Sequence, residues 1–258
     1  MPTALVTGAS RGIGRGVAIA LARAGWRVFA TGRTVAGAEL PPAVARIACD
    51  HADDAQTLRA FDEVAAAGGG LDVLVHGAWG GYERMVEDGV FTWLDPFWAQ
   101  PAHRWTGMFD AGVRAAFIAS QHAARQMLPE RRGLIVHLGF WAAQRHLGNA
   151  IYGAAKAATD KLAVEMAHEL RPHGIAVVSL YPGLVRTESV LAAAAHGAFD
   201  LANSESPEFI GRVIAALHAD PLLMRRSGQV VVAAAAAREL GVVDVDGKSP
   251  EPLNLAGS

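Results

Sequence analysis

The stretch Thr7-Gly8-Ala9-Ser10-Arg11-Gly12-Ile13-Gly14 joins a short apolar run, residues 4–6, to a segment of helical periodicity, residues 12–24. Glycines at such a junction let the backbone approach a pyrophosphate, whose charge is attracted by free N–H groups and by the positive end of the helix dipole. Because the turn directly follows an expected strand and opens an expected helix, we interpret it as a dinucleotide-binding turn and not as a plain connection. The cofactor contacts expected in it are Gly8, Ser10, Arg11, Gly12, Ile13 and Gly14.

Short β-like runs alternate with helical stretches along the rest of the chain. This alternation predicts an α/β fold with a doubly wound parallel sheet, for which a hydrophobic content of 52% supplies the core. We expect a single domain over residues 1–258. The strands are expected at residues 4–6, 27–30, 47–49, 73–75, 134–137, 176–180 and 230–232, and the helices at residues 12–24, 53–67, 102–127, 149–171 and 207–218.

The charge and the cysteine content argue against several classes of protein. A formal net charge of -2 leaves no basic excess to neutralise a nucleic-acid backbone. The single cysteine, Cys49, makes an internal disulfide impossible and gives a metal site no thiol support, so we expect no metal. The N-terminal residues lack a basic, then apolar, leader pattern, and no run reaches 18 apolar residues. We therefore expect a cytoplasmic protein that binds a small molecule and neither nucleic acid nor a membrane.

The end of the second expected strand indicates the type of cofactor. An NAD-specific protein carries a carboxylate there, which binds the adenosine 2′-OH, whereas this chain has Gly32 followed by Arg33. A guanidinium can pair bidentately with a 2′-phosphate, so NADP(H) is favoured over NAD(H). Arg11 can add a second positive charge near that phosphate. The alternative is that either arginine is an ordinary solvated residue.

Two later motifs complete a family pattern. Tyr152 and Lys156 lie one helical turn apart, and Tyr181-Pro182-Gly183 follows the sixth expected strand. With the glycine turn, these motifs resemble the short-chain dehydrogenase/reductase family over nearly the whole chain. Within the family, the chain looks closest to the group typified by dehydrogenase/reductase member 1, through residues 133–136, 160–163, 167–171 and 244–247.

The resemblance implies a three-layer Rossmann fold of about seven strands and a homodimer or homotetramer formed through the two long helices. It implies that Tyr152 donates a proton to the substrate carbonyl, while the Lys156 ammonium lowers the pKa of that phenol and holds the cofactor ribose. The segment 188–206 is then the substrate lid. The other cofactor contacts carried over by position are Asp50 to the adenine, the turn at Pro182 and Gly183, and Thr187 to the carboxamide.

Three positions depart from the family pattern. Gly139 stands where the family has the serine that hydrogen-bonds the substrate oxygen, and Gly112 stands where it usually has an asparagine. Trp79 replaces a small neighbour of the cofactor. We expect Phe140 and Trp141 to crowd a serine restored at position 139. The nearby polar residues that could replace the serine are His137, Gln144, His146 and Asn149; His137 reads better as a core histidine, and His146 is the better substitute.

Aromatic residues are concentrated in residues 79–101, between a strand and a long helix. They either wall an apolar substrate pocket or form a loop packed on the core or on another subunit. The leading interpretation is an NADPH-dependent oxidoreductase that reduces a carbonyl, or an imine, of a bulky apolar molecule, with Tyr152 as the acid. The alternatives are a non-redox enzyme on the same scaffold, such as a dehydratase or cyclase, and an NADPH-binding protein without turnover.

Overall fold

The seven predicted strands form one parallel sheet in the computed structural model, which describes residues 1–253 of the chain. Residues 254–258 of the predicted domain lie outside the described residues. The order of the seven strands across the sheet is β11-β8-β7-β4-β1-β2-β3, which confirms the predicted doubly wound Rossmann architecture. The strands are β1 (Thr3–Thr7), β2 (Arg27–Gly32), β3 (Ala45–Ala48), β4 (Val73–His76), β7 (Gly133–Leu138), β8 (Ile175–Tyr181) and β11 (Val230–Val232).

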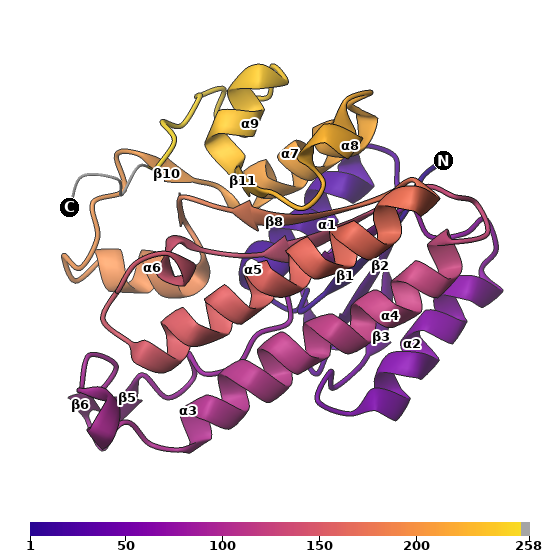
Figure 1. Ribbon diagram of the computed structural model, residues 1–258. Coiled ribbons are helices and arrows are strands. Elements are labelled where there is room, and N and C mark those ends of the chain that lie inside the picture. Colours follow the sequence, from indigo (N-terminus) through magenta and orange to yellow (C-terminus); the bar gives the residue numbers. More distant parts are fainter. Residues whose placement is uncertain (254–258) are drawn as a thin grey trace.

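Helices cover both faces of this sheet. In Figure 1, α2, α4 and α5 run side by side along one face, and α1, α7 and α9 lie on the other. The central strands are buried on both sides, which explains why they read as continuous apolar runs without alternation. The helices are α1 (Gly12–Arg23), α2 (Asp54–Ala66), α3 (His103–Trp105), α4 (Ala115–Met127), α5 (Ala150–Leu170), α6 (Glu188–Ala194), α7 (Pro207–Ala219), α8 (Leu223–Arg226) and α9 (Ala233–Glu239).

The strand order changes direction between β1 and β4, so their carboxyl ends open a crevice at this edge of the sheet. The glycine turn leaves β1 there, the aromatic segment leaves β4, and Gly139 follows β7 beside them. In Figure 1 the small hairpin of β5 (Val86–Glu87) and β6 (Val90–Phe91) projects near α3. The fold therefore gathers the predicted cofactor, catalytic and substrate segments at one edge.

The predicted helix over residues 102–127 is not one α-helix. It consists of α3, a π-helical segment η3 (Thr106–Arg114) and α4. Gly107 packs against the backbone of Gly80 and Gly81, with a hypothetical Cβ at Gly107 only 2.9 Å from the Gly81 nitrogen. A π-helical stretch is uncommon and is found mostly at functional sites. Apolar periodicity does not reveal it, because the pattern of buried positions continues across it.

Short elements in the loops were missed for a different reason. The pairs β5–β6 and β9–β10 have two residues per strand, and the 3-10 turns have three residues each, too few for a repeating pattern. The chain after residue 243, expected at the surface, contains the buried Asp244, which accepts hydrogen bonds from Arg186 and Ser206. The short elements are β9 (Leu184–Val185), β10 (Ser204–Glu205), η1 (Val35–Gly37), η2 (Phe97–Ala99), η4 (Trp141–Ala143) and η5 (Arg171–His173). Within residues 1–253, no helix combines the length and apolar character needed to cross a membrane.

Candidate active site

The glycine turn has a backbone that only glycine fits. Gly8 and Gly12 have φ angles of +66° and +57°, in the left-handed region. A Cβ atom at Gly8 would lie 2.5 Å from the Gly77 oxygen, and one at Gly14 would lie 2.4 Å from the Gly8 oxygen. The turn therefore presses β1, the start of α1 and the end of β4 together without side chains. This leaves the first N–H groups of α1 open to a ligand.

A carboxylate lies at the start of α1. The backbone N–H of Gly12 donates to both oxygens of Glu188, at 3.3 and 3.0 Å, and Arg15 forms an ion pair with the same carboxylate at 2.8 Å. Glu188 is the first residue of α6, in the segment interpreted as a lid. The N-terminus of α1 thus binds an anionic group, as the glycine turn predicts.

A second carboxylate lies between the two arginines interpreted as phosphate contacts. Arg11 and Arg33 come from different loops, and both are exposed. Their guanidinium groups lie 3.2 and 3.9 Å from one oxygen of Glu83, whose other oxygen accepts from the Gly81 N–H. Two cations therefore converge on one anion near the end of β2.

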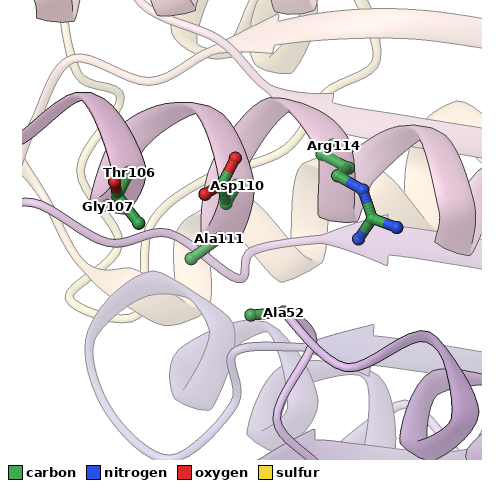
Figure 2. A pocket seen from close by; sticks show the side chains of 6 residues that line it. All are labelled: Ala52, Thr106, Gly107, Asp110, Ala111 and Arg114. Carbon is green, nitrogen blue, oxygen red and sulfur yellow. The ribbon is translucent and has the colours of Figure 1, made fainter.

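The other predicted cofactor residues occupy the same edge. The Asp50 carboxylate accepts from the Ala52 N–H at 3.0 Å, and the Gly183 N–H donates to Glu205 at 2.9 Å. Thr187 caps α6 through the Val190 N–H. Figure 2 shows Ala52 across a groove of about 470 Å³ from the face of η3 that carries Asp110 and Arg114. Of the remaining three, Pro182 is buried in the turn before Gly183, Ile13 packs against the core, and Ser10 has its hydroxyl where a Cβ at Gly32 would lie.

Tyr152 is fixed by the start of α5. The side chain of Asn149 caps this helix and accepts from the Tyr152 N–H at 2.9 Å, which places Tyr152 in the first turn. Its side chain is buried, and burial raises the pKa of Tyr152 to about 12, while the influence of Tyr82 lowers it. Four aromatic rings surround it with centroid distances of 5.4 to 6.5 Å: Trp79, Tyr82, Trp93 and Phe140. We call these five residues the aromatic box.

Lys156 is buried on the same face of α5. Its Nζ atom donates to the Leu138 carbonyl at 2.9 Å and lies 3.8 Å from the centre of the Trp79 ring. Burial lowers the pKa of Lys156 to about 7, although Asp160, one turn further along α5, raises it. The ammonium is therefore held beside the aromatic box by a carbonyl and a ring face, and its charge changes near neutral pH.

Gly139 has no room for a side chain. A Cβ at this buried position would lie 2.3 Å from the Ser179 hydroxyl and 2.6 Å from the Tyr181 ring. Both of these residues donate hydrogen bonds to Asp160. A restored serine would therefore meet Ser179 and Tyr181 of β8, the neighbouring strand, which the sequence did not indicate.

Gly112 is matched to Trp79 in the same way. A Cβ at Gly112 would lie 2.8 Å from the Trp79 ring, so the indole fills the space that a side chain from η3 would occupy. The Gly112 carbonyl lies 3.2 Å from Nε2 of His76, and since a carbonyl only accepts, this nitrogen carries the proton. Two departures from the family pattern are thus a single structural replacement.

The polar residues considered as substitutes for the serine have other roles. Asn149 is buried as the helix cap, and its amide donates to the Trp93 carbonyl at 3.0 Å. His137 lies inside β7 with its Nε2 3.3 Å from the Ser120 hydroxyl, and burial lowers the pKa of this histidine to about 4. Gln144 lies 3.5 Å from the Tyr181 hydroxyl, and His146 is exposed. Neither histidine is close to Tyr152 in any contact described for residues 1–253.

The aromatic segment divides into two parts. Trp79, Tyr82 and Trp93 face Tyr152, whereas Phe97 and Trp98 are 68% and 77% exposed. The first part of the segment therefore packs around Tyr152, and the second part lies at the surface.

A residue that the sequence did not single out anchors the segment. Arg104, in α3, is fully buried. Its guanidinium donates to the Thr92 and Arg84 carbonyls at 2.8 and 3.0 Å, to the Thr92 hydroxyl at 2.6 Å and to the Gln100 side chain. No spacing rule identifies such a residue, because its partners are backbone and side-chain groups of an irregular loop.

The chain shares its fold and much of its sequence with known oxidoreductases. The family model for short chain dehydrogenase matches residues 2–196. The chain is 36% identical to the mouse (Mus musculus) protein dehydrogenase/reductase SDR family member 1 over 95% of this chain and 83% of that one. It is 38% identical to D-erythrulose reductase of Gallus gallus over 72% of each. A short-chain type dehydrogenase/reductase from Mycobacterium ulcerans superposes with a TM-score of 0.71, 28% identity and coverage of 90% and 87%. The chain belongs to the short-chain dehydrogenase/reductase family of oxidoreductases.

Proposed function

We propose that the protein is an NADPH-dependent reductase of a carbonyl, or of an imine, in a bulky apolar small molecule. The observation that carries this proposal is the placement of Tyr152 and Lys156. They are buried side by side at the carboxyl edge of the sheet, inside an aromatic box and next to the glycine turn. A protein that only stored the cofactor would have no use for a buried phenol at this place.

The residues present fit a bound NADP(H). The glycine turn and the N-terminus of α1 already hold a carboxylate, that of Glu188, where the pyrophosphate would lie. Arg11 and Arg33 converge on Glu83 and would hold the 2′-phosphate in its place. Asp50, Pro182, Gly183 and Thr187 line the same edge and are the proposed contacts of the adenine and nicotinamide ends. Lys156 is the proposed contact of the ribose.

The chain's own groups then define the proton transfer. Bound NADPH supplies a hydride to the substrate carbon. Tyr152 donates its proton to the substrate oxygen or nitrogen, so that the O–H bond of the phenol breaks and an alcohol or amine results. The ammonium of Lys156 stabilises the phenolate left behind. No serine hydroxyl is present at Gly139, and the loss of one such donor lowers the rate by roughly 100-fold to 1000-fold. An imine, which develops less negative charge, would depend on such a donor less.

The substrate class follows from the aromatic box. D-erythrulose reductase and L-xylulose reductase are among the relatives, so their names link the family to reduction of a carbonyl group. In this chain the apolar residues Trp79, Trp93 and Phe140 lie around Tyr152. We infer an apolar, ring-sized substrate here.

The proposed assembly rests on two exposed apolar side chains. Phe117 of α4 and Val164 of α5 are 40% and 44% exposed, which supports a homodimer or homotetramer formed through these two helices. The proposed unit is a single domain over residues 1–258, located in the cytoplasm.

Cofactor binding is tested by titration of nicotinamide fluorescence with NADPH and NADH. We expect saturable binding with NADPH at least about tenfold tighter, since one charge-assisted phosphate contact contributes about 1.5–3 kcal/mol. Arg33→Ala should remove most of this difference, and Arg23→Ala, an exposed residue in the last turn of α1, should not. Absence of saturable NADPH binding would sink the proposal.

A non-redox enzyme is the second candidate, favoured by Gly139 and by the position of Trp79 over Lys156. The two are separated by supplying a panel of carbonyl and imine compounds with NADPH. A reductase consumes NADPH in a fixed ratio to product, whereas a dehydratase or cyclase forms product without consuming it. Binding of NADPH with no product from any compound would indicate the third alternative, a binding protein.

A further inference from the structure

Tyr82 is the only residue of the aromatic box, besides Tyr152 itself, that carries a hydroxyl. Its ring centroid lies 5.9 Å from that of Tyr152 and 5.7 Å from that of Trp93. The residue is 44% exposed, so it forms a wall between Tyr152 and solvent and is not part of the core.

The two other places from which a donor would come are closed. The position of the family serine has no space beyond the Cα of Gly139, because Ser179 and Tyr181 fill it and donate to Asp160. The position of the family asparagine is filled by the Trp79 ring above Gly112. A hydroxyl that reaches Tyr152 must therefore come from the pocket side.

The local backbone holds Tyr82 at this place. Gly81 has a φ of +96°, and a Cβ there would lie 2.8 Å from the Met108 side chain. On the other side, Glu83 accepts from the Gly81 N–H at 2.9 Å and pairs with Arg11. A tight approach to η3 before Tyr82 and an ion pair after it limit where its ring can go.

We propose that the hydroxyl of Tyr82 acts on Tyr152 itself: it donates a hydrogen bond to the oxygen of Tyr152 and stabilises the charge that develops there when Tyr152 gives up its proton. The inference rests on the proposed function. During the step the O–H bond of Tyr152 breaks, its proton passes to the substrate, and the O–H bond of Tyr82 stays intact. In agreement, the interaction with Tyr82 lowers the pKa of Tyr152 against the effect of burial.

The indole of Trp79 is the competing donor, since its Nε1 atom is buried without a hydrogen-bond partner among the described residues. That atom is fully covered by protein, so a substrate does not reach it in this arrangement. The ring of Tyr82 is exposed, whereas its hydroxyl is on the covered side: burial raises the pKa of Tyr82 well above its usual range, and Tyr152 raises it further. The structure therefore favours the phenol over the indole.

Tyr82→Phe tests the proposal because it removes the hydroxyl and keeps the ring. We expect kcat for reduction to fall about 10-fold to 100-fold, with KM and NADPH affinity within about twofold of the original. Because the lost hydrogen bond lowers the pKa of Tyr152, the alkaline limb of the kcat profile should move to higher pH. Trp98→Phe, in the same segment but exposed and in contact with Phe97, is the matched control and should change neither quantity. An unchanged kcat in Tyr82→Phe, or a loss that appears only in Trp79→Phe, would overturn the proposal.

A second readout does not need turnover. The chain has three tyrosines, so protein labelled at the tyrosine Cζ carbon gives three carbon resonances, which three Tyr→Phe variants assign. Tyr82→Phe should shift the Tyr152 resonance, and Trp98→Phe should leave it in place. If no substrate is turned over but this shift is seen, the proposed function fails and the contact stands. If the Tyr152 resonance is unmoved, the role of Tyr82 is rejected whatever the activity.

Discussion

The carboxyl edge of the sheet has two halves that are built by different means. Around β1 and β2 lies the backbone half, which consists mainly of a glycine turn and the N–H groups of α1, together with two exposed arginines. Around β4, β7 and β8 lies the side-chain half, in which buried rings fill the space beside glycines: Tyr181 beside Gly139, and Trp79 beside Gly112. In the backbone half, N–H groups and exposed cations are held by a turn, whereas the side-chain half is a set of buried groups packed around Tyr152.

The largest expected effect comes from closing the backbone half. Gly14→Ala places a Cβ 2.4 Å from the Gly8 oxygen, so the turn must open. We expect NADPH affinity to fall ~100-fold, which corresponds to about 2.7 kcal/mol, as measured by the fluorescence titration. Gly37→Ala is the matched control, since a Cβ at Gly37 meets nothing within 4 Å. Equal affinity in both variants would show that the turn does not hold the cofactor.

The packing of the side-chain half is tested by placing a serine at position 139. Gly139→Ser should destabilise the fold by about 2 kcal/mol, because the new side chain overlaps Ser179 and Tyr181. Chemical denaturation measures this loss. In a Tyr181→Ala background the same substitution should be much less destabilising, since the space has been opened. An equal loss in both backgrounds would contradict the packing described for this strand end.

Glu205 links the two halves through the turn that follows β8. It is 1% exposed, and burial raises its pKa to about 7. A raised folded-state pKa gives stability that is complete below the unfolded-state pKa of 4.5 and is lost as the pH rises through about 7. Glu205→Gln, which still accepts from the Gly183 N–H, should therefore stabilise the protein by about 1–2 kcal/mol at pH 8 and by less at pH 5. Thermal unfolding at the two pH values measures it, and a gain that is the same at both would exclude titration of this carboxylate.

The smallest expected effect concerns the entry of the cofactor phosphate. Glu83 forms ion pairs with Arg11 and Arg33. Glu83→Gln should therefore free the two arginines and tighten NADPH binding a few-fold. The gain should stay below about 1 kcal/mol because the pairs are exposed. NADH, which has no 2′-phosphate, should bind as before. If both cofactors gain equally, the arginines do not serve as a 2′-phosphate site.

The cofactor half could be predicted from the sequence because its rules are local. A glycine with positive φ, a strand before it and a helix after it are all visible within residues 3–23. The sheet was equally accessible, since seven apolar runs separated by helical periods determine its strands. The positions of the Glu83 and Glu188 carboxylates could not be predicted in this way, because both residues come from loops distant in the sequence.

The side-chain half could be located from the sequence, but its packing could not be predicted. Gly139 and Gly112 were visible as departures, yet their partners Tyr181 and Trp79 lie 42 and 33 residues away in the chain and meet them only in the folded protein. The same applies to Tyr82, whose proposed role depends on the turn at Gly81, where the backbone approaches Met108 closely. Side-chain complementarity across elements has no sequence period, so it requires the structure.

The most direct test of the central claim follows the hydride and the proton together. NADPH deuterated at the transferred position is mixed with enzyme and a carbonyl or imine substrate in a single turnover, and the product is analysed by mass spectrometry. The account predicts deuterium on the former carbonyl or imine carbon, formed at least about 100-fold more slowly by Tyr152→Phe although that variant binds NADPH normally. Deuterium transfer at an equal rate in Tyr152→Phe, or product without deuterium, would contradict it.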